Sequence, residues 1–193
     1  MDGLRYAIAL ALLLVMPGVY LYWFLVHPWV HLWRRIGVRR TLVIVYTPIV
    51  LAATGFFLAR KSLLAVEWGT DWRLIAAAIP FFALAAWLRR QLAGRLTFAT
   101  LIGIPELDPN RRPARLLTDG IYARLRHPRY VQIVVALAGY ALVANYLATY
   151  VIAGVGLIWL WLVVRIEERE LRERFGAEWE AYAARVPRFL PRW

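Results

Sequence analysis

The chain has 193 residues, of which 62% are hydrophobic and 19% charged, and its formal net charge is +12. Soluble domains are about 45–50% apolar and about 25% charged, so this composition nearly excludes a soluble globular protein. The absence of cysteine excludes disulfides, zinc thiolate sites and cysteine nucleophiles. Such a net charge would favour nucleic-acid binding in a soluble protein, but the positions of the basic residues explain it better, and no nucleic-acid partner is expected.

Five apolar stretches have close to the roughly 20 residues that a helix needs to cross a bilayer. In chain order they are 4–26, 41–59, 72–88, 130–145 and 147–166. The last two are separated only by Asn145 and Tyr146, which predicts a tight helical hairpin. A cleaved signal peptide is the alternative for the first stretch, which is longer than the 7–15 apolar residues typical of such peptides. The sequence therefore predicts an all-α, polytopic membrane protein with about five transmembrane helices.

The basic residues predict the orientation of these spans. With five spans, 4 basic residues lie on the side of the N-terminus and 20 lie on the opposite side. We therefore expect the N-terminus outside and the C-terminus in the cytoplasm, in a bacterial or archaeal inner membrane. The charge then also serves to attract anionic membrane lipids.

The chain divides into an N-terminal part with three spans (1–90) and a C-terminal half (91–193). The second part comprises an interfacial loop, the hairpin 130–166 and an amphipathic tail. The centres of the first three spans hold no Asp, Glu, Lys or His. Since ion paths and proton relays need such groups inside the membrane, this argues against a pump, channel or secondary transporter.

Two polar clusters flank the last hairpin, at 118–130 and 165–171. The start of one antiparallel helix lies beside the end of the next. The two clusters should therefore meet at the cytoplasmic interface, although about 40 residues separate them in the chain.

The first cluster leads into a helix. Pro128 suits the first helical position, because its missing N–H would be unpaired there in any case, and this places His127 at or just before the cap. A helix start offers N–H groups and partial positive charge to a carboxylate or another anion. The alternative is that Arg126, Arg129 and Tyr130 only anchor the helix among lipid headgroups.

The second cluster contains one acid without a helical partner. Glu168 has Arg172 four residues on, an ordinary surface pair. Glu167 has no cation three or four residues away on either side. It therefore needs a partner from elsewhere, either Arg126 or Arg129 in the first cluster or a ligand.

The pattern of the tail from 167 to 184 predicts an amphipathic helix. Its apolar stripe consists of Leu171, Phe175, Trp179 and Tyr182. Folded back over the spans, such a helix would cover a pocket made by the two clusters. Arg188, which follows the helix, could then return a cation to that pocket.

The short motifs of the C-terminal half have a characteristic order and spacing. With x for any residue they are T-D-G-x-Y (118–122), R-H-P-x-Y (126–130), E-E-x-x-L (167–171), F-G-x-x-W-x-x-Y (175–182) and V-P-R (186–188). Over about residues 95–193 the chain thereby resembles the superfamily of isoprenylcysteine carboxyl methyltransferases and phospholipid methyltransferases. One departure is Gln132, which stands where these enzymes often have glycine.

The resemblance implies a small integral membrane enzyme that uses S-adenosylmethionine, bound at the cytoplasmic end of the hairpin. It implies that the cofactor is bound by His127, Pro128, Tyr130, Glu167 and Glu168. No metal is expected.

Two further residues of the first cluster are expected at the cofactor. Arg126 could hold its carboxylate, and Tyr122, like Tyr130, could pack on adenine or face the sulfonium. The candidate catalytic residues are His127, which could deprotonate an amine or thiol acceptor, and Arg188.

The expected acceptor is lipid-like or membrane-associated. An isoprenylcysteine carboxylate is the first choice, and a phospholipid amine or a small hydrophobic thiol or acid are the others. Two alternatives are a nicotinamide-dependent membrane reductase with a related hairpin and a non-enzymatic membrane scaffold, in which Glu167 would be locked to an arginine. The sequence leaves the oligomeric state open.

Overall fold

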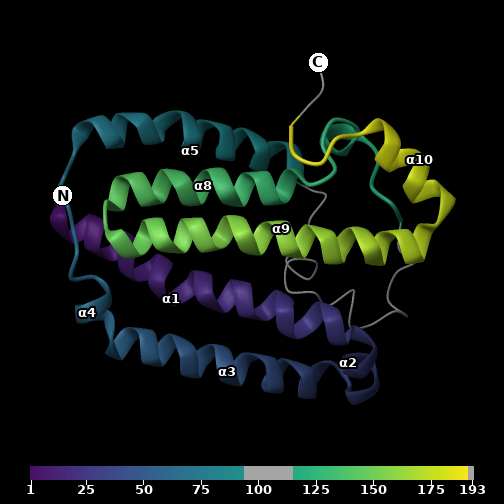
Figure 1. Ribbon diagram of the computed structural model, residues 1–193, viewed down its shortest axis with the longest axis horizontal. Helices are drawn as coiled ribbons and strands as arrows, with labels where there is room; N and C mark the ends of the chain where they lie inside the picture. The colour runs from purple at the N-terminus through teal and green to yellow at the C-terminus, as the bar shows by residue number, and fades with distance from the viewer. Residues whose placement is uncertain (94–114, 191–193) are drawn as a thin grey trace.

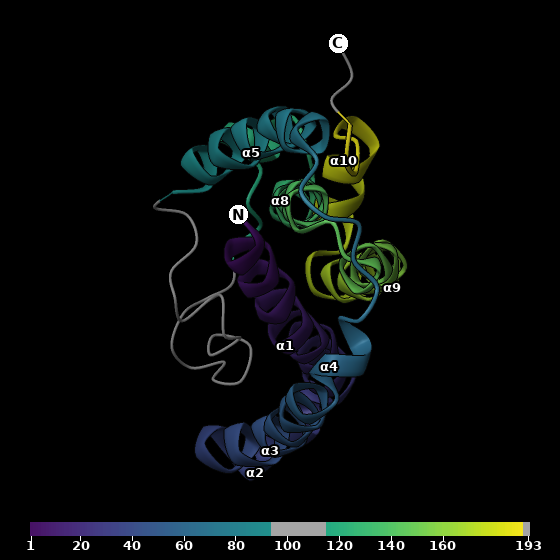
Figure 2. The ribbon, with the colours of Figure 1, turned by 90° about the vertical axis from the view of Figure 1, so that its left-hand side faces the viewer.

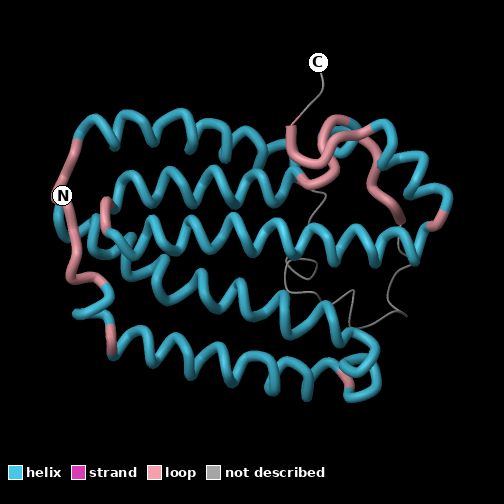
Figure 3. The backbone as a smooth tube through the Cα atoms, in the orientation of Figure 1, coloured by secondary structure: helices cyan, strands magenta, loops and turns pink. Residues whose placement is uncertain are grey.

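The computed structural model describes residues 1–93 and 115–190, and its regular elements there are helices apart from one isolated β-bridge. The long helices of the described residues lie side by side (Figures 1 and 3). They are α1 (Asp2–Val26), α3 (Val38–Leu58), α5 (Trp72–Leu92), α8 (Pro128–Ala144) and α9 (Leu147–Phe175). Short elements connect or follow them: η1 (His27–Trp29), α2 (Val30–Ile36), α4 (Arg60–Leu63), η2 (Gly120–Ala123) and α10 (Ala177–Arg185).

The predicted spans coincide with the long helices, except that two of them extend one residue further, to Ala59 after α3 and to Asn145 after α8. Within the described ranges, α1, α3, α5 and α9 are long and apolar enough to cross a membrane, and α8 is a shorter apolar helix of 17 residues. Many of their large apolar side chains are exposed, among them Leu51, Leu58 and Ile79. A soluble protein would bury such a surface, whereas a bilayer accepts it. The prediction of an all-α, polytopic membrane protein is confirmed.

The helix α8 is the most enclosed of the long helices. It packs against α5 on one side and against α9 and α1 on the others, while α3 packs against α1 (Figures 1 and 2). Close approach of α5 requires Gly139, because a Cβ there would lie 2.9 Å from the Phe82 ring. The main apolar core lies where α1, α8 and α9 meet, and it includes the aromatic residues Tyr20, Tyr130 and Trp159.

The predicted tight hairpin is formed by Asn145 and Tyr146. Asn145 ends α8 with a left-handed backbone (φ 58°), a conformation that asparagine tolerates better than most residues. Its side-chain nitrogen donates to the carbonyl of Gly69 (3.0 Å), and its own carbonyl accepts from the N–H of Trp68 (3.2 Å). The turn is therefore held by the segment between α4 and α5.

The loops are distributed between the two ends of the bundle as the five-span prediction requires. The N-terminus, the segment 64–71 and the turn at 145–146 lie at one end, and α2, η2 and α10 lie at the other (Figure 1). Much of the predicted interfacial loop, at 94–114, lies outside the described residues. The division of the chain at residue 90 and the direction in which the two ends face stay predictions.

The tail corrects one prediction, because 167–184 is not a single helix. The helix α9 continues to Phe175, and Gly176 then adopts a positive φ of 50° before α10 begins. Glycine adopts this conformation without the steric cost of a Cβ, so it ends a helix readily. The apolar stripe nevertheless stays together: Trp179 and Tyr182 are buried, and Leu171 and Phe175 pack beside them.

Candidate active site

The start of α8 positions His127. As predicted, Pro128 is the first residue of the helix and His127 is its N-cap. Both are buried. The chain arrives there from η2, whose first residue, Gly120, has a positive φ of 57°.

The end of the described chain folds back onto this segment. The N–H of Arg126 donates to the carbonyl of Pro187 (2.9 Å), and the N–H of His127 donates to the carbonyl of Arg188 (3.1 Å). The Tyr182 hydroxyl donates to the carbonyl of Tyr122 (2.7 Å). These bonds bring the tail beside the start of α8, so that Arg188 reaches the hairpin, as the sequence predicts.

Glu168 is the centre of the resulting cluster. Its side chain is only 6% exposed, and it contacts three basic groups from two other segments. Its Oε1 lies 3.0 Å from Nη1 of Arg126 and 3.1 Å from Nε2 of His127. Arg188 donates to Oε2 from Nη2 (2.7 Å) and from Nε (3.0 Å). One buried carboxylate thus joins α9, the start of α8 and the tail.

These contacts keep Glu168 ionised. The residue lies in the charged part of α9 that follows the apolar stretch 147–164. Burial on its own raises the pKa of Glu168, but hydrogen bonds from His127 and Arg188 and the charge of Arg126 outweigh burial and lower the pKa to about 2. In return, the hydrogen bond to Glu168 raises the pKa of Arg188.

His127 lies between two carboxylates. Ionised Glu168 can only accept hydrogen bonds, so Nε2 of His127 carries the ring proton and donates a hydrogen bond to Oε1. The other ring nitrogen, Nδ1, lies 3.8 Å from Oε2 of Glu167. In the neutral imidazole this nitrogen has a free lone pair, so it is the one that can accept a proton.

Glu167 supplies the polar atom that best fits a ligand. Its Oε2 is buried and has no hydrogen-bond partner within the described part of the chain, and the same holds for Nε of Arg126. Buried polar atoms are normally paired, so this acceptor and this donor need a further group. An amino group or ribose hydroxyls would satisfy the carboxylate, and a carboxylate would satisfy the guanidinium. Both kinds of group occur in S-adenosylmethionine.

The arginines that could have paired with Glu167 have other partners. Arg126 contacts Glu168, and Arg129 donates to Oε1 of Gln132 (2.9 Å). Within residues 1–93 and 115–190, no ion pair of Glu167 with an arginine is present. The lock expected of a non-enzymatic scaffold is therefore not seen there.

The predicted surface pair between Glu168 and Arg172 is wrong. Arg172 pairs with Glu180 of α10 instead. The break at Gly176 turns α10 back toward α9 and offers Arg172 this second acid. Helical spacing therefore missed the central acid of the cluster, which only the E-E motif had indicated.

The aromatic residues divide between two sides of the cluster. Tyr130 is buried, with its ring centroid 5.8 Å from that of His127 and 5.8 Å from that of Trp23. Tyr122 instead packs against a group of residues that includes Leu88 and Leu92 of α5. Sequence reasoning singled out neither Trp23 nor Phe189, whose ring lies 6.1 Å from His127. The position of Trp23 at the end of the first span was the available signal.

Comparison with known proteins identifies a family whose model spans the helices that carry most of the cluster. Residues 72–178 match the family model described as phospholipid methyltransferase, which covers more than half of the chain and includes α5, α8 and α9. The chain is also 39% identical over 79 residues to a protein of Schizosaccharomyces pombe named Protein-S-isoprenylcysteine O-methyltransferase. That match covers 39% of this chain and 33% of the yeast protein, so the chain spans about a third of its relative. No solved structure matches the chain.

Proposed function

The chain belongs to the phospholipid methyltransferase family, and on this basis we propose that it transfers a methyl group from S-adenosylmethionine to a lipid-like acceptor in the membrane. An isoprenylcysteine carboxylate is the favoured acceptor, in line with the yeast relative, and a phospholipid amine or a small thiol is the next choice. The observation that carries the proposal is the buried, unsatisfied Oε2 of Glu167 beside His127 and the Glu168 cluster.

Different residues of the cluster bind different groups of the cofactor. Glu167 accepts from the α-amino group or the ribose hydroxyls, and Arg126 donates from Nε to the carboxylate. Pro128 and Tyr130 form the apolar wall next to His127. Glu168 positions these groups, because it holds Arg126, His127 and Arg188 together.

The reaction needs orientation more than acid–base chemistry. When bound, S-adenosylmethionine supplies a methyl group on a sulfonium: the bond from methyl carbon to acceptor oxygen forms, the carbon–sulfur bond breaks, and its electron pair leaves with the sulfur as a neutral thioether. A carboxylate acceptor has no proton to lose, so the protein has only to align the two groups and exclude water. An amine or thiol acceptor loses a proton, which Nδ1 of His127 can take while Nε2 stays bonded to Glu168.

The position of the site suits two substrates from different phases. The cluster lies at the end of α9 where the apolar stretch gives way to charged residues. A polar cofactor can arrive from the aqueous side and a lipid-like acceptor from the bilayer. The excess of basic residues at this end supports a cytoplasmic active site with the N-terminus outside.

A binding experiment tests the proposal. The protein purified in detergent is titrated with S-adenosylmethionine, S-adenosylhomocysteine and NADPH in a calorimeter. We expect micromolar binding of the first two and none of NADPH. Binding of NADPH alone would make the chain a nicotinamide-dependent reductase, and no binding of any of the three would leave a membrane scaffold.

A further inference from the structure

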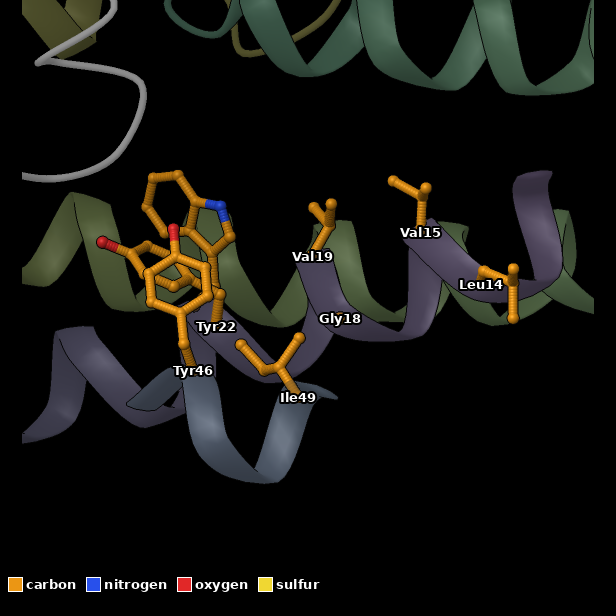
Figure 4. Close-up of a pocket in the computed structure, with 8 residues that line it drawn as sticks. Leu14, Val15, Gly18, Val19, Tyr22, Tyr46 and Ile49 are labelled. Atoms are coloured by element: carbon orange, nitrogen blue, oxygen red, sulfur yellow. The ribbon is translucent and has the colours of Figure 1, made fainter. Parts of the chain in front are cut away.

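A groove of about 350 Å³ lies between α1 and α3, apart from the cluster around Glu168 (Figure 4). It is lined by Leu14, Val15, Gly18, Val19, Tyr22, Trp23, Tyr46 and Ile49. The lining residues of α1 recur at intervals of three and four, so they share one face of that helix. At 1.5 Å per residue, the face extends for about 13 Å between Leu14 and Trp23.

The groove has an apolar end and an aromatic end. Leu14, Val15 and Val19 form the apolar part, in the middle of a helix that crosses the membrane. Tyr22 and Tyr46, whose rings lie 5.8 Å apart, stand at the other end. Since both helices lie in the apolar layer, the group that fits this groove is a hydrocarbon chain with its polar end at the tyrosines.

The aromatic end of the groove adjoins the candidate active site. Trp23 lines the groove, and its ring contacts the rings of Tyr130 (5.8 Å) and Trp159 (6.4 Å). The Tyr130 ring in turn lies 5.8 Å from that of His127. A chain lying along α1 with its polar end at Trp23 would therefore present that end to the His127 cluster.

We propose that this groove binds the hydrocarbon chain of the methyl acceptor, with the reactive end of the acceptor beside Trp23 and Tyr130. The assignment rests on the proposed function for the identity of the chain, and on continuity through Trp23 for its direction. A chain in this groove gives specificity for long apolar acceptors, because each buried methylene contributes to binding.

A substitution that fills the groove tests the proposal by enzyme kinetics. Val15 lines the groove and is 53% exposed, so Val15→Trp adds volume there without displacing the core. The matched control is Val155→Trp on α9, where the valine is 49% exposed and lines no part of the groove. S-farnesylcysteine is compared with S-dimethylallylcysteine, which has a short chain. The preference in kcat/KM for S-farnesylcysteine should fall about tenfold in Val15→Trp, the equivalent of about two buried methylenes. It should stay unchanged in the control, and an unchanged preference in both variants would overturn the proposal.

A binding test separates this proposal from the proposed function. S-farnesylcysteine with a diazirine at the end of its chain should label peptides of α1 or α3. Excess S-farnesylcysteine and the Val15→Trp substitution should both suppress this labelling. Labelling without methyl transfer would refute the methyltransferase and keep the groove, whereas methyl transfer with labelling elsewhere would refute the groove alone. A phosphatidylcholine with a diazirine in its chain serves as a second probe. If it labels α1 or α3 equally and S-farnesylcysteine does not displace it, the groove binds ordinary membrane lipid.

Discussion

Among the described residues, a fully buried charged side chain lies at each end of the bundle, Arg5 at one and Glu168 at the other, and the two are satisfied in different ways. At the end that holds the N-terminus, Arg5 is 1% exposed, and all three of its guanidinium nitrogens have partners within the protein. Nε donates to the carbonyl of Ala144 (3.0 Å), Nη1 to Asp2 (3.1 Å) and Nη2 to Glu67 (3.2 Å). These hydrogen bonds hold α1, the segment before α5 and the hairpin turn together.

At the other end Glu168 joins three segments in the same manner, but the cluster around it is not complete. Buried atoms of Glu167 and Arg126 are left without hydrogen bonds within the described ranges. A complete cluster holds the fold together, and an incomplete one has capacity for a ligand. We therefore expect changes at Arg5 to affect stability alone, changes at Glu167 to affect binding alone, and changes at Glu168 to affect both.

Glu168→Gln should have the largest effect. It leaves Arg126, whose side chain is 13% exposed, without a counter-charge, and breaking such a buried pair costs about 4 kcal/mol in the free energy of unfolding. The loss of alignment at His127 should lower methyl transfer about a hundredfold. Thermal unfolding in detergent and a methyl-transfer assay measure the two effects. A variant as stable as the wild type would show that Glu168 does not hold the segments together.

Acid should reproduce part of this effect in the wild type. The pKa of Glu168 is lowered to about 2, below its ordinary value of 4.5. A lowered pKa gives stability that is present above the ordinary value and is lost as the pH falls toward about 2, here on the order of 3 kcal/mol. Unfolding measured between pH 6 and pH 3 should therefore show a loss of stability that Glu168→Gln lacks. Equal acid dependence of the two proteins would contradict the assignment.

Arg5→Met should have a smaller effect on stability and none on binding. The variant keeps an apolar stem but loses the hydrogen bonds to Ala144, Asp2 and Glu67. The two acids are 84% and 47% exposed and can be solvated by water, so the free energy of unfolding should fall by only about 2 kcal/mol. The control is Arg73→Met, an exposed arginine at the same end. If Arg5→Met folds but binds S-adenosylmethionine with a changed dissociation constant, the contacts of Arg5 are not separate from the binding site.

Much of the fold could be predicted because length and apolarity determine it. The spans need about 20 apolar residues, and a two-residue link between the last two allows only a tight hairpin. The break at Gly176 was missed because the apolar stripe continues through it, from Leu171 to Tyr182, with helical spacing. Periodicity reports which residues face the core and is insensitive to a single turn between two helices.

The sequence predicts which segments of the chain meet at the site, but not which side chains contact one another there. The antiparallel hairpin brings His127 next to the Glu pair, and this followed from chain direction alone. Which acid is buried depends on where the chain returns: Arg188 reaches Glu168, and Glu180 takes Arg172 away from it. These choices are made by α10 and the tail after the break, so helical spacing could not reveal them.

Glu167→Gln tests the incomplete side of the comparison and should have the smallest effect. The amide keeps the size of the side chain but loses the charge that attracts an amino group. The dissociation constant of S-adenosylmethionine should therefore rise about tenfold, while the free energy of unfolding stays within about 0.5 kcal/mol of the wild type. The matched control is Glu173→Gln, an exposed acid on the same helix, which should change neither quantity. Unchanged affinity would remove Glu167 from the binding site, and a loss of stability as large as that of Glu168→Gln would make it part of the structural cluster, so the two acids of the motif would no longer have separate roles.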